Sequence, residues 1–174
     1  MSISLDSASI ALSFDPQASP PTANHQQILR FSLGLQDSAL LPLEQITEIL
    51  KINSVEVLPI PETHSCVLGV CNWRGEMLWV IDLEHLVGYA PLLQQVQSEP
   101  LIVMVIHWND HLLGLGVRQV GEIERHELQK LQPVIPGLFP PQLQPFVLGT
   151  LLECSGAVLD IAAIAQCPLW QSQR

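Results

Sequence analysis

The stretch VLGVCNWRGEMLWVIDL, residues 67–83, reads as two apolar strands joined by a single Arg-Gly dipeptide. Gly75 can adopt the positive φ that a tight two-residue turn requires, so the stretch predicts a β-hairpin. Arg74 at the predicted tip is one of only 7 Lys and Arg residues in a chain that carries 17 Asp and Glu residues. The hairpin is therefore expected to present a rare cation.

Composition favours a small protein that meets its partners through apolar surface. The 174 residues suit one domain or two very small ones. Hydrophobic residues make up 48% of the chain and charged residues only 14%, so some apolar surface is expected to stay exposed, and exposed apolar patches usually mark partner sites. The net charge of -10 argues against nucleic acid, because neutralising phosphates requires clustered Lys and Arg.

The lack of a recognisable targeting signal and the spacing of the cysteines lead us to expect a cytoplasmic protein. The longest clean apolar run is LIVMVI at residues 101–106, far short of the roughly 20 residues that a membrane-spanning helix needs. The N-terminal sequence lacks the cationic start and solid apolar stretch of a signal peptide. The 4 cysteines form no C-x-x-C pair, which disfavours a zinc knuckle or a thioredoxin-type site and favours reduced, buried thiols.

Turn residues divide the chain into a tail and a folded region. Residues 1–24 are rich in Ser, Ala and Pro and are expected to form a flexible tail. From Ile28 onward, short apolar runs are broken by turn residues. This pattern predicts hairpins around residues 35–38, around Asn109-Asp110 and within residues 146–161. The run VEVLPIP at residues 55–61 predicts a further short extended segment.

The two halves of the chain follow one plan. A shift of 74 residues without gaps aligns Leu41, Gln45, Glu48 and Ile49 with Leu115, Gln119, Glu122 and Ile123. Each half then continues with a VLG strand, a turn and an acid-tipped strand. We predict an all-β fold of two β-barrels with about five strands each, packed across an apolar seam. Subdomain 1 is placed at about 28–88, a polar linker at 89–99 and subdomain 2 at about 100–166.

The hairpin also carries a resemblance to a known family. The sequence GVCNWRGEMLWVIDLEHLVG, residues 69–88, resembles the signature of the CheW family, the adaptor proteins of bacterial chemosensory arrays. The family pattern is a hydrophobic strand with G-x-x-N-x-R-G, then a second strand that ends in V-x-D-L. It is filled here by Gly69, Asn72, Arg74, Gly75, Asp82 and Leu83. Similar hairpins lie upstream and downstream, and the likeness spans residues 28–166.

The resemblance implies a fold, a role and a set of contact residues. The fold would be two SH3-like five-stranded β-barrels with short helical connectors. The role would be that of a non-catalytic adaptor, without cofactor or metal, that couples chemoreceptors to a kinase. Its partners would be the regulatory domain of a CheA-type histidine kinase and the cytoplasmic tip of a methyl-accepting chemoreceptor, which would bring the protein to membrane receptor arrays. The implied partner-binding residues are Ile46, Glu48, Asn72, Arg74, Gly75, Val117 and Val120.

Physical chemistry leaves two roles open for several of these residues. Arg74 can present a planar fork to a partner's carboxylate, or it can act as an internal brace against Asp82 or a turn carbonyl. Ile46 can belong to the core or to an exposed contact. Glu48 is expected to be solvated or to face a partner, because an unpaired carboxylate is costly to bury.

Two positions depart from the family pattern. Trp79 stands where the family usually has proline, which changes the local surface. Arg118 stands where the family often has aspartate, which reverses a charge. Both departures suggest a divergent partner, such as a paralogous array that serves pilus-based motility or phototaxis.

Two other classes of function compete with the adaptor hypothesis. A small-molecule binder or enzyme on a double β-barrel would need convergent polar groups, for which His64 with Cys66 is a candidate pair, and Trp73 with Trp79 could contact a ligand. An RNA-binding SH3-like barrel would need a basic face. His107 and His111 flank a turn between strands, where an i, i+4 pair does not form a helical metal site. No catalytic or metal-binding residue is therefore predicted.

Overall fold

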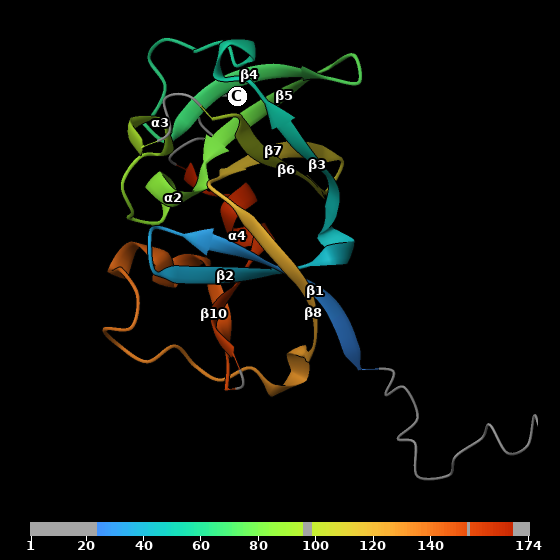
Figure 1. Ribbon diagram of the computed structural model, residues 1–174, viewed down its shortest axis with the longest axis vertical. Coiled ribbons are helices and arrows are strands. Elements are labelled where there is room, and N and C mark those ends of the chain that lie inside the picture. The colour runs from blue at the N-terminus through green and yellow to red at the C-terminus, as the bar shows by residue number, and fades with distance from the viewer. Residues whose placement is uncertain (1–23, 96–98, 153, 169–174) are drawn as a thin grey trace, which may run out of the picture.

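A computed structural model describes residues 24–95, 99–152 and 154–168 of the chain. The described residues form two five-stranded sheets with short helical segments between strands (Figure 1). In chain order the elements are β1 (His25–Leu33), β2 (Asp37–Pro42), η1 (Leu43–Gln45), β3 (Ile46–Ile52), η2 (Ser54–Glu56), β4 (Val67–Trp73), β5 (Glu76–Asp82), α2 (Leu83–Leu86), α3 (Leu92–Gln95), β6 (Leu101–Trp108), β7 (His111–Val117), β8 (Val120–Glu127), η3 (Leu128–Lys130), η4 (Pro141–Phe146), β9 (Val147–Leu151), β10 (Cys154–Leu159) and α4 (Ile161–Ala165). The predicted tail at 1–24 lies outside the described residues except for Asn24.

The two sheets have the same topology. Sheet A has the strand order β8-β1-β2-β10-β9, and sheet B has the order β3-β6-β7-β5-β4. Strands five places apart in the chain therefore occupy equivalent positions. In both sheets one internal pair is parallel, β2 with β10 and β5 with β7, and the other neighbours are antiparallel. The prediction of an all-β fold built twice on one plan is confirmed.

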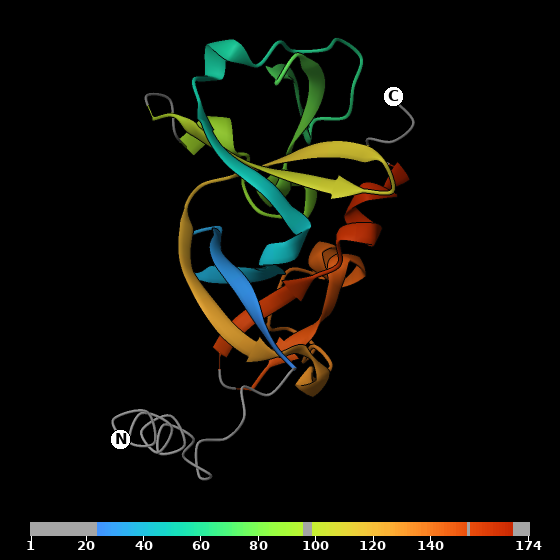
Figure 2. The same ribbon diagram turned by 90° about the vertical axis from the view of Figure 1, so that its right-hand side faces the viewer.

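The boundaries predicted for the two subdomains do not match the sheets. Sheet A combines β1 and β2 from the first half of the chain with β8, β9 and β10 from the second half, so neither 28–88 nor 100–166 forms a unit by itself. The chain crosses between the sheets after β2 and after β7, as Figure 2 shows for β8. The two halves share one apolar pattern, so the sequence gives no indication of which copy each hairpin pairs with.

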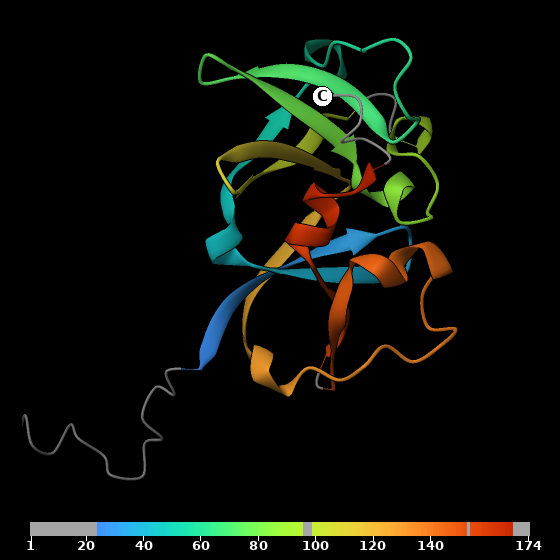
Figure 3. The same cartoon turned by 180° about the vertical axis from the view of Figure 1, so that it is seen from behind.

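Apolar residues on both faces of the central strands create the predicted seam. On β6, Leu101, Val103 and Val105 face the interior of sheet B. The alternate residues Met104 and Ile106 face the other way and pack with apolar residues of sheet A. That shared cluster also includes Phe31 and Leu41 of sheet A and residues of α4, which lies beside the boundary between the sheets (Figures 2 and 3).

Two predicted segments differ from expectation. The linker at 89–99 begins as a packed segment, because the Tyr89 hydroxyl donates to Asp37 Oδ2 at 2.6 Å and Leu92 is buried. Residues 55–61 form no strand and contribute only a bridge from Leu58 to Val70, since their prolines cannot donate to a ladder. In the part of the chain that the structure describes, no helix is long and apolar enough to span a membrane.

Candidate partner-binding site

The β4–β5 hairpin forms as predicted, with Arg74 and Gly75 as its two turn residues. Arg74 has φ 50 and Gly75 has φ 80, the pair of positive values that a type I′ turn requires. The Asn72 side chain closes the turn, because its Oδ1 accepts a hydrogen bond from Gly75 N at 3.0 Å. Asn72 thus has a structural role, and Gly75 supplies the backbone conformation that places Arg74 at the tip.

Glu48 lies opposite this hairpin and binds two of its residues. Its Oε2 accepts a hydrogen bond from Trp73 Nε1 at 2.7 Å and lies 3.1 Å from Arg74 Nη2. Glu48 belongs to β3 and Trp73 to β4, which are the two opposite edges of sheet B. Two edges of one sheet can meet in this way only if the sheet curls round. The resemblance placed Glu48 and Arg74 in one site, and the structure brings these two side chains together.

Arg74 is braced yet remains accessible. Its guanidinium lies 4.8 Å from the centroid of the Trp73 ring and pairs with Glu48, while 65% of its side chain stays exposed. The brace predicted from sequence therefore exists, but its partner is Glu48, not Asp82. Because most of the side chain is exposed, the guanidinium can still donate hydrogen bonds to another molecule. The exposed ion pair itself contributes little to stability.

Asp82 caps the short helix α2. Its Oδ1 accepts from His85 N at 3.0 Å, which caps α2, and its Oδ2 accepts from Leu92 N at 2.8 Å. The side chain is buried, and burial raises its pKa above the ordinary value. Asp82 therefore anchors the start of the linker and is not available to Arg74.

The remaining predicted contact residues differ in exposure. Ile46 and Val120 are half-buried and pack against the seam cluster. They occupy equivalent positions, at the start of β3 and of β8. Val117 is only 1% exposed and belongs to that cluster, so its buried side chain does not favour the partner contact predicted for it. Val117 ends β7, and its side chain packs among the apolar residues that the two sheets share.

Trp79 and Arg118, the two residues that depart from the family pattern, both make contacts inside the fold. Trp79 is half-buried and packs against the seam cluster. Arg118 Nη2 lies 3.0 Å from Oε2 of Glu84, a carboxylate of α2 that is 0% exposed. Burial raises the pKa of Glu84, and the hydrogen bond and charge of Arg118 oppose that increase. Arg118 thus neutralises a buried charge, and neither departure requires a different partner.

An apolar groove beside the hairpin was missed by the sequence reasoning. It has a volume of about 550 Å³. The groove is lined by Ile52, Val55, Glu56, Leu58, Val70, Cys71, Asn72, Gly75, Glu76 and Met77. Val55, Leu58 and Met77 are exposed large hydrophobic residues, with Met77 at 71%. The alternation of β5 did not reveal the groove, because Met77 shares its face of the strand with the apolar residues Trp79 and Ile81.

The strongest catalytic candidate has the wrong electrostatics for a nucleophile. His64 Nδ1 lies 3.1 Å from Cys66 Sγ, so the predicted pair does form. Cys66 is fully buried, and this burial raises its pKa to about 11. The thiol is therefore protonated at neutral pH, whereas a thiol nucleophile must ionise.

Comparison with known proteins identifies the family. A family model described as CheW-like domain matches residues 27–167. A protein of Helicobacter pylori (strain ATCC 700392 / 26695), named "Chemotaxis protein CheW", is 30% identical over 108 residues, which are 62% of this chain and 62% of that protein. The aligned region thus spans less than two thirds of that relative.

A solved structure shares the fold. The scaffolding protein TtCheW of Thermoanaerobacter tengcongensis superposes with a TM-score of 0.64 and 22% sequence identity, over 78% of this chain and 89% of that chain. The family match covers both sheets and includes the Arg-Gly hairpin with its Glu48 brace. The chain belongs to the CheW-like domain family.

Proposed function

We propose that this chain is a non-catalytic adaptor that couples chemoreceptors to a CheA-type histidine kinase. Membership of the CheW-like family supports the role, and the relatives are named as a chemotaxis protein and a scaffolding protein. The proposed partners are the regulatory domain of the kinase and the cytoplasmic tip of a methyl-accepting chemoreceptor. The adaptor would then act in the cytoplasm at receptor arrays.

The observation that best supports the proposal is the exposed, braced Arg74. Glu48 and the Trp73 ring fix the orientation of its guanidinium before any partner arrives, so little side-chain entropy remains to be lost on binding. The apolar groove beside it, with Val55, Leu58 and Met77, offers contact area next to the charge. Apolar area beside an arginine anchor is typical of the centre of a protein interface.

The output of the proposed array is not specified by the site. Trp79 and Arg118, which suggested pilus-based motility or phototaxis, both make contacts within the fold. The proposal therefore stops at the coupling of receptor to kinase.

Reconstitution tests the proposed function. The purified chain would be mixed with the CheA-type kinase from the same cell and with vesicles that carry the receptor, and kinase autophosphorylation would be measured. We expect stimulation only when all three components are present, and loss of stimulation with Arg74→Glu. Arg125→Glu is the matched control, because it makes the same charge change at an exposed arginine on sheet A. ATP hydrolysis by the chain alone, or equal stimulation without it, would contradict the proposal.

A further inference from the structure

Sheet A contains a cluster of metal-ligating side chains at a distance from the hairpin. Glu124 and His126 lie two residues apart on β8 and so share one face of the strand, and Cys154 begins β10. One potential ligand atom from each residue lies within 4.8 Å of the other two. All three side chains are half-buried. No pattern in the sequence predicted the cluster, because Cys154 is remote in the chain.

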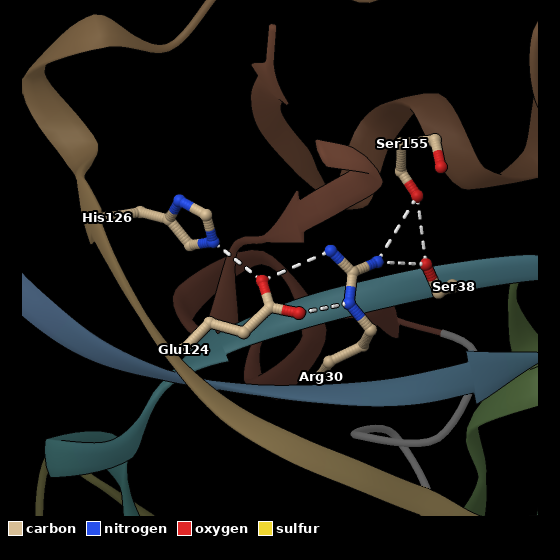
Figure 4. A network of polar contacts seen from close by, with 5 residues as sticks. All are labelled: Arg30, Ser38, Glu124, His126 and Ser155. Atoms are coloured by element: carbon tan, nitrogen blue, oxygen red, sulfur yellow. Dashed lines mark hydrogen bonds and ion pairs between the residues drawn. The ribbon is translucent and has the colours of Figure 1, made fainter. Parts of the chain in front are cut away.

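Arg30 holds the cluster together. Figure 4 shows the Glu124 carboxylate between His126 and the Arg30 guanidinium. Arg30 donates to both oxygens of Glu124, from Nε to Oε1 at 2.5 Å and from Nη2 to Oε2 at 3.2 Å. Its Nη1 donates to Ser38 Oγ at 2.6 Å and to the Ser155 carbonyl at 3.3 Å. One side chain of β1 thereby contacts β8, β2 and β10. The curl of sheet A, with Arg30 at its centre, brings β8 and β10 together although two strands separate them in the sheet order.

We propose that Glu124, His126 and Cys154 form a site for a divalent transition-metal ion, with Zn²⁺ as the best match. Carboxylate, imidazole and thiolate are the three ligand types that Zn²⁺ takes in proteins. Three protein ligands leave the fourth tetrahedral position for water. A thiolate ligand disfavours Mg²⁺ and Ca²⁺, which prefer oxygen donors. This inference is independent of the adaptor role.

Metal binding would exchange one contact for another. His126 Nε2 now lies 2.6 Å from Glu124 Oε2, a separation too short for two ligands placed tetrahedrally at about 2.0–2.2 Å from zinc. The ion would enter between them and replace that contact, together with the 3.2 Å hydrogen bond from Arg30 Nη2 to Oε2. Arg30 would keep its hold on Oε1 and orient the carboxylate, as outer-shell groups do in metal sites.

The charges around the cluster allow a cation. Glu124 supplies one negative charge, and its carboxylate lies against the cation of Arg30. The carboxylate and a Cys154 thiolate would together neutralise the two charges of the ion. Arg30 would remain as an adjacent cation.

Cobalt substitution provides the test. The full chain would be titrated with Co²⁺ alone, which gives a thiolate-to-cobalt charge-transfer band and intense visible bands when its geometry is tetrahedral. Zn²⁺ affinity would then be measured by displacement of the cobalt. We expect one ion per chain. Cys154→Ser and His126→Gln should each lower the metal affinity by about 100-fold or more, which is a larger loss than the removal of an outer-shell partner usually causes.

A second pair of residues supplies the matched control. His64 and Cys66 also place an imidazole beside a thiol, so Cys66→Ser should leave the cobalt spectrum and the zinc affinity unchanged. In the unaltered chain, excess Zn²⁺ should raise the melting temperature, a result that does not depend on any variant folding. Absence of the thiolate band in the unaltered chain, persistence of the affinity in Cys154→Ser, or its loss in Cys66→Ser would each overturn the proposal.

Discussion

Glu48 and Trp73 lie on the two opposite edge strands of sheet B, and the 2.7 Å hydrogen bond from Trp73 Nε1 to Glu48 Oε2 joins those edges. The same Oε2 pairs with Arg74, one residue further along the hairpin. A single carboxylate oxygen thus links the curl of the sheet to the orientation of the exposed guanidinium. The site and the fold therefore depend on the same residue, and their contributions must be separated by experiment.

Glu48 substitutions should divide these contributions. Glu48→Ala removes the acceptor of the buried Trp73 indole, so we expect a loss of about 1–3 kcal/mol in the free energy of unfolding. Glu48→Gln keeps an acceptor for the indole but removes the charge that faces Arg74, and it should cost less than half of that amount. Urea denaturation of both variants measures the difference. Equal destabilisation by the two would show that the ion pair, not the indole hydrogen bond, matters for stability.

Two glycines of the same hairpin should respond very differently to alanine. At Gly69, which has φ 141, a Cβ atom would lie 2.1 Å from the Leu58 carbonyl oxygen, so Gly69→Ala should break the Leu58–Val70 bridge and cost about 3–5 kcal/mol. At Gly75, which has φ 80, a Cβ meets nothing within 4 Å, so only conformational strain of about 1–2 kcal/mol is expected. Thermal unfolding compares the pair, and similar losses would contradict this account.

Arg118→Ala should destabilise the protein in a pH-dependent way. It leaves the fully buried Glu84 carboxylate without its cation, which should cost about 3–5 kcal/mol at neutral pH. The pKa of Glu84 is already raised above 4.5 by burial, so the folded state holds more protons and stability falls as the pH rises from about 4.5 through the raised pKa. Removing Arg118 raises that pKa further, and the loss should be larger at pH 8 than at pH 5.

Glu84→Gln in the Arg118→Ala background supplies the control for that measurement. It removes the titrating group, so the additional pH dependence between pH 5 and pH 8 should disappear. A destabilisation by Arg118→Ala that is the same at both pH values would show that Arg118 acts through packing rather than through the charge of Glu84.

Local features of the fold were predictable from the sequence. The hairpin at Arg74-Gly75 and the helix cap at Asp82 each depend on residues within a few positions, and both are present. The internal repeat was also visible, because its apolar pattern recurs at a fixed shift. Its pairing was not, since β1 and β2 satisfy the same pattern whether they join strands of their own half or of the other half.

The contacts of the site were beyond sequence reasoning because they are long-range. Glu48 meets Trp73 only because the edges of sheet B converge, and no local pattern encodes that curl. Arg118 looked like a surface departure because its partner, Glu84, lies 34 positions away. Val117 was implied as a contact residue by the resemblance alone, and no local pattern shows that its side chain packs into the cluster between the sheets.

A charge swap at the braced pair tests the central claim most directly. The claim is that Arg74 contacts a partner while Glu48 only orients it. Binding to the regulatory domain of the kinase and to the receptor tip would be measured for Arg74→Glu, for Arg74→Lys, and for Arg74→Glu combined with Glu48→Arg, with melting temperatures alongside. Lysine keeps the charge but loses the bidentate fork, so it should lie between the unaltered chain and Arg74→Glu.

The double variant separates the two roles. It can re-form the ion pair with reversed charges, but Glu48→Arg also removes the acceptor of the Trp73 indole. We therefore expect its melting temperature to lie above that of Glu48→Arg alone and below that of the unaltered chain. Its affinity should stay low, because a carboxylate now stands at the hairpin tip, and the loss should be about 2–5 kcal/mol, or roughly 30-fold to several thousand-fold in Kd. Restoration of affinity by the swap, or unchanged affinity in a folded Arg74→Glu protein, would contradict the claim.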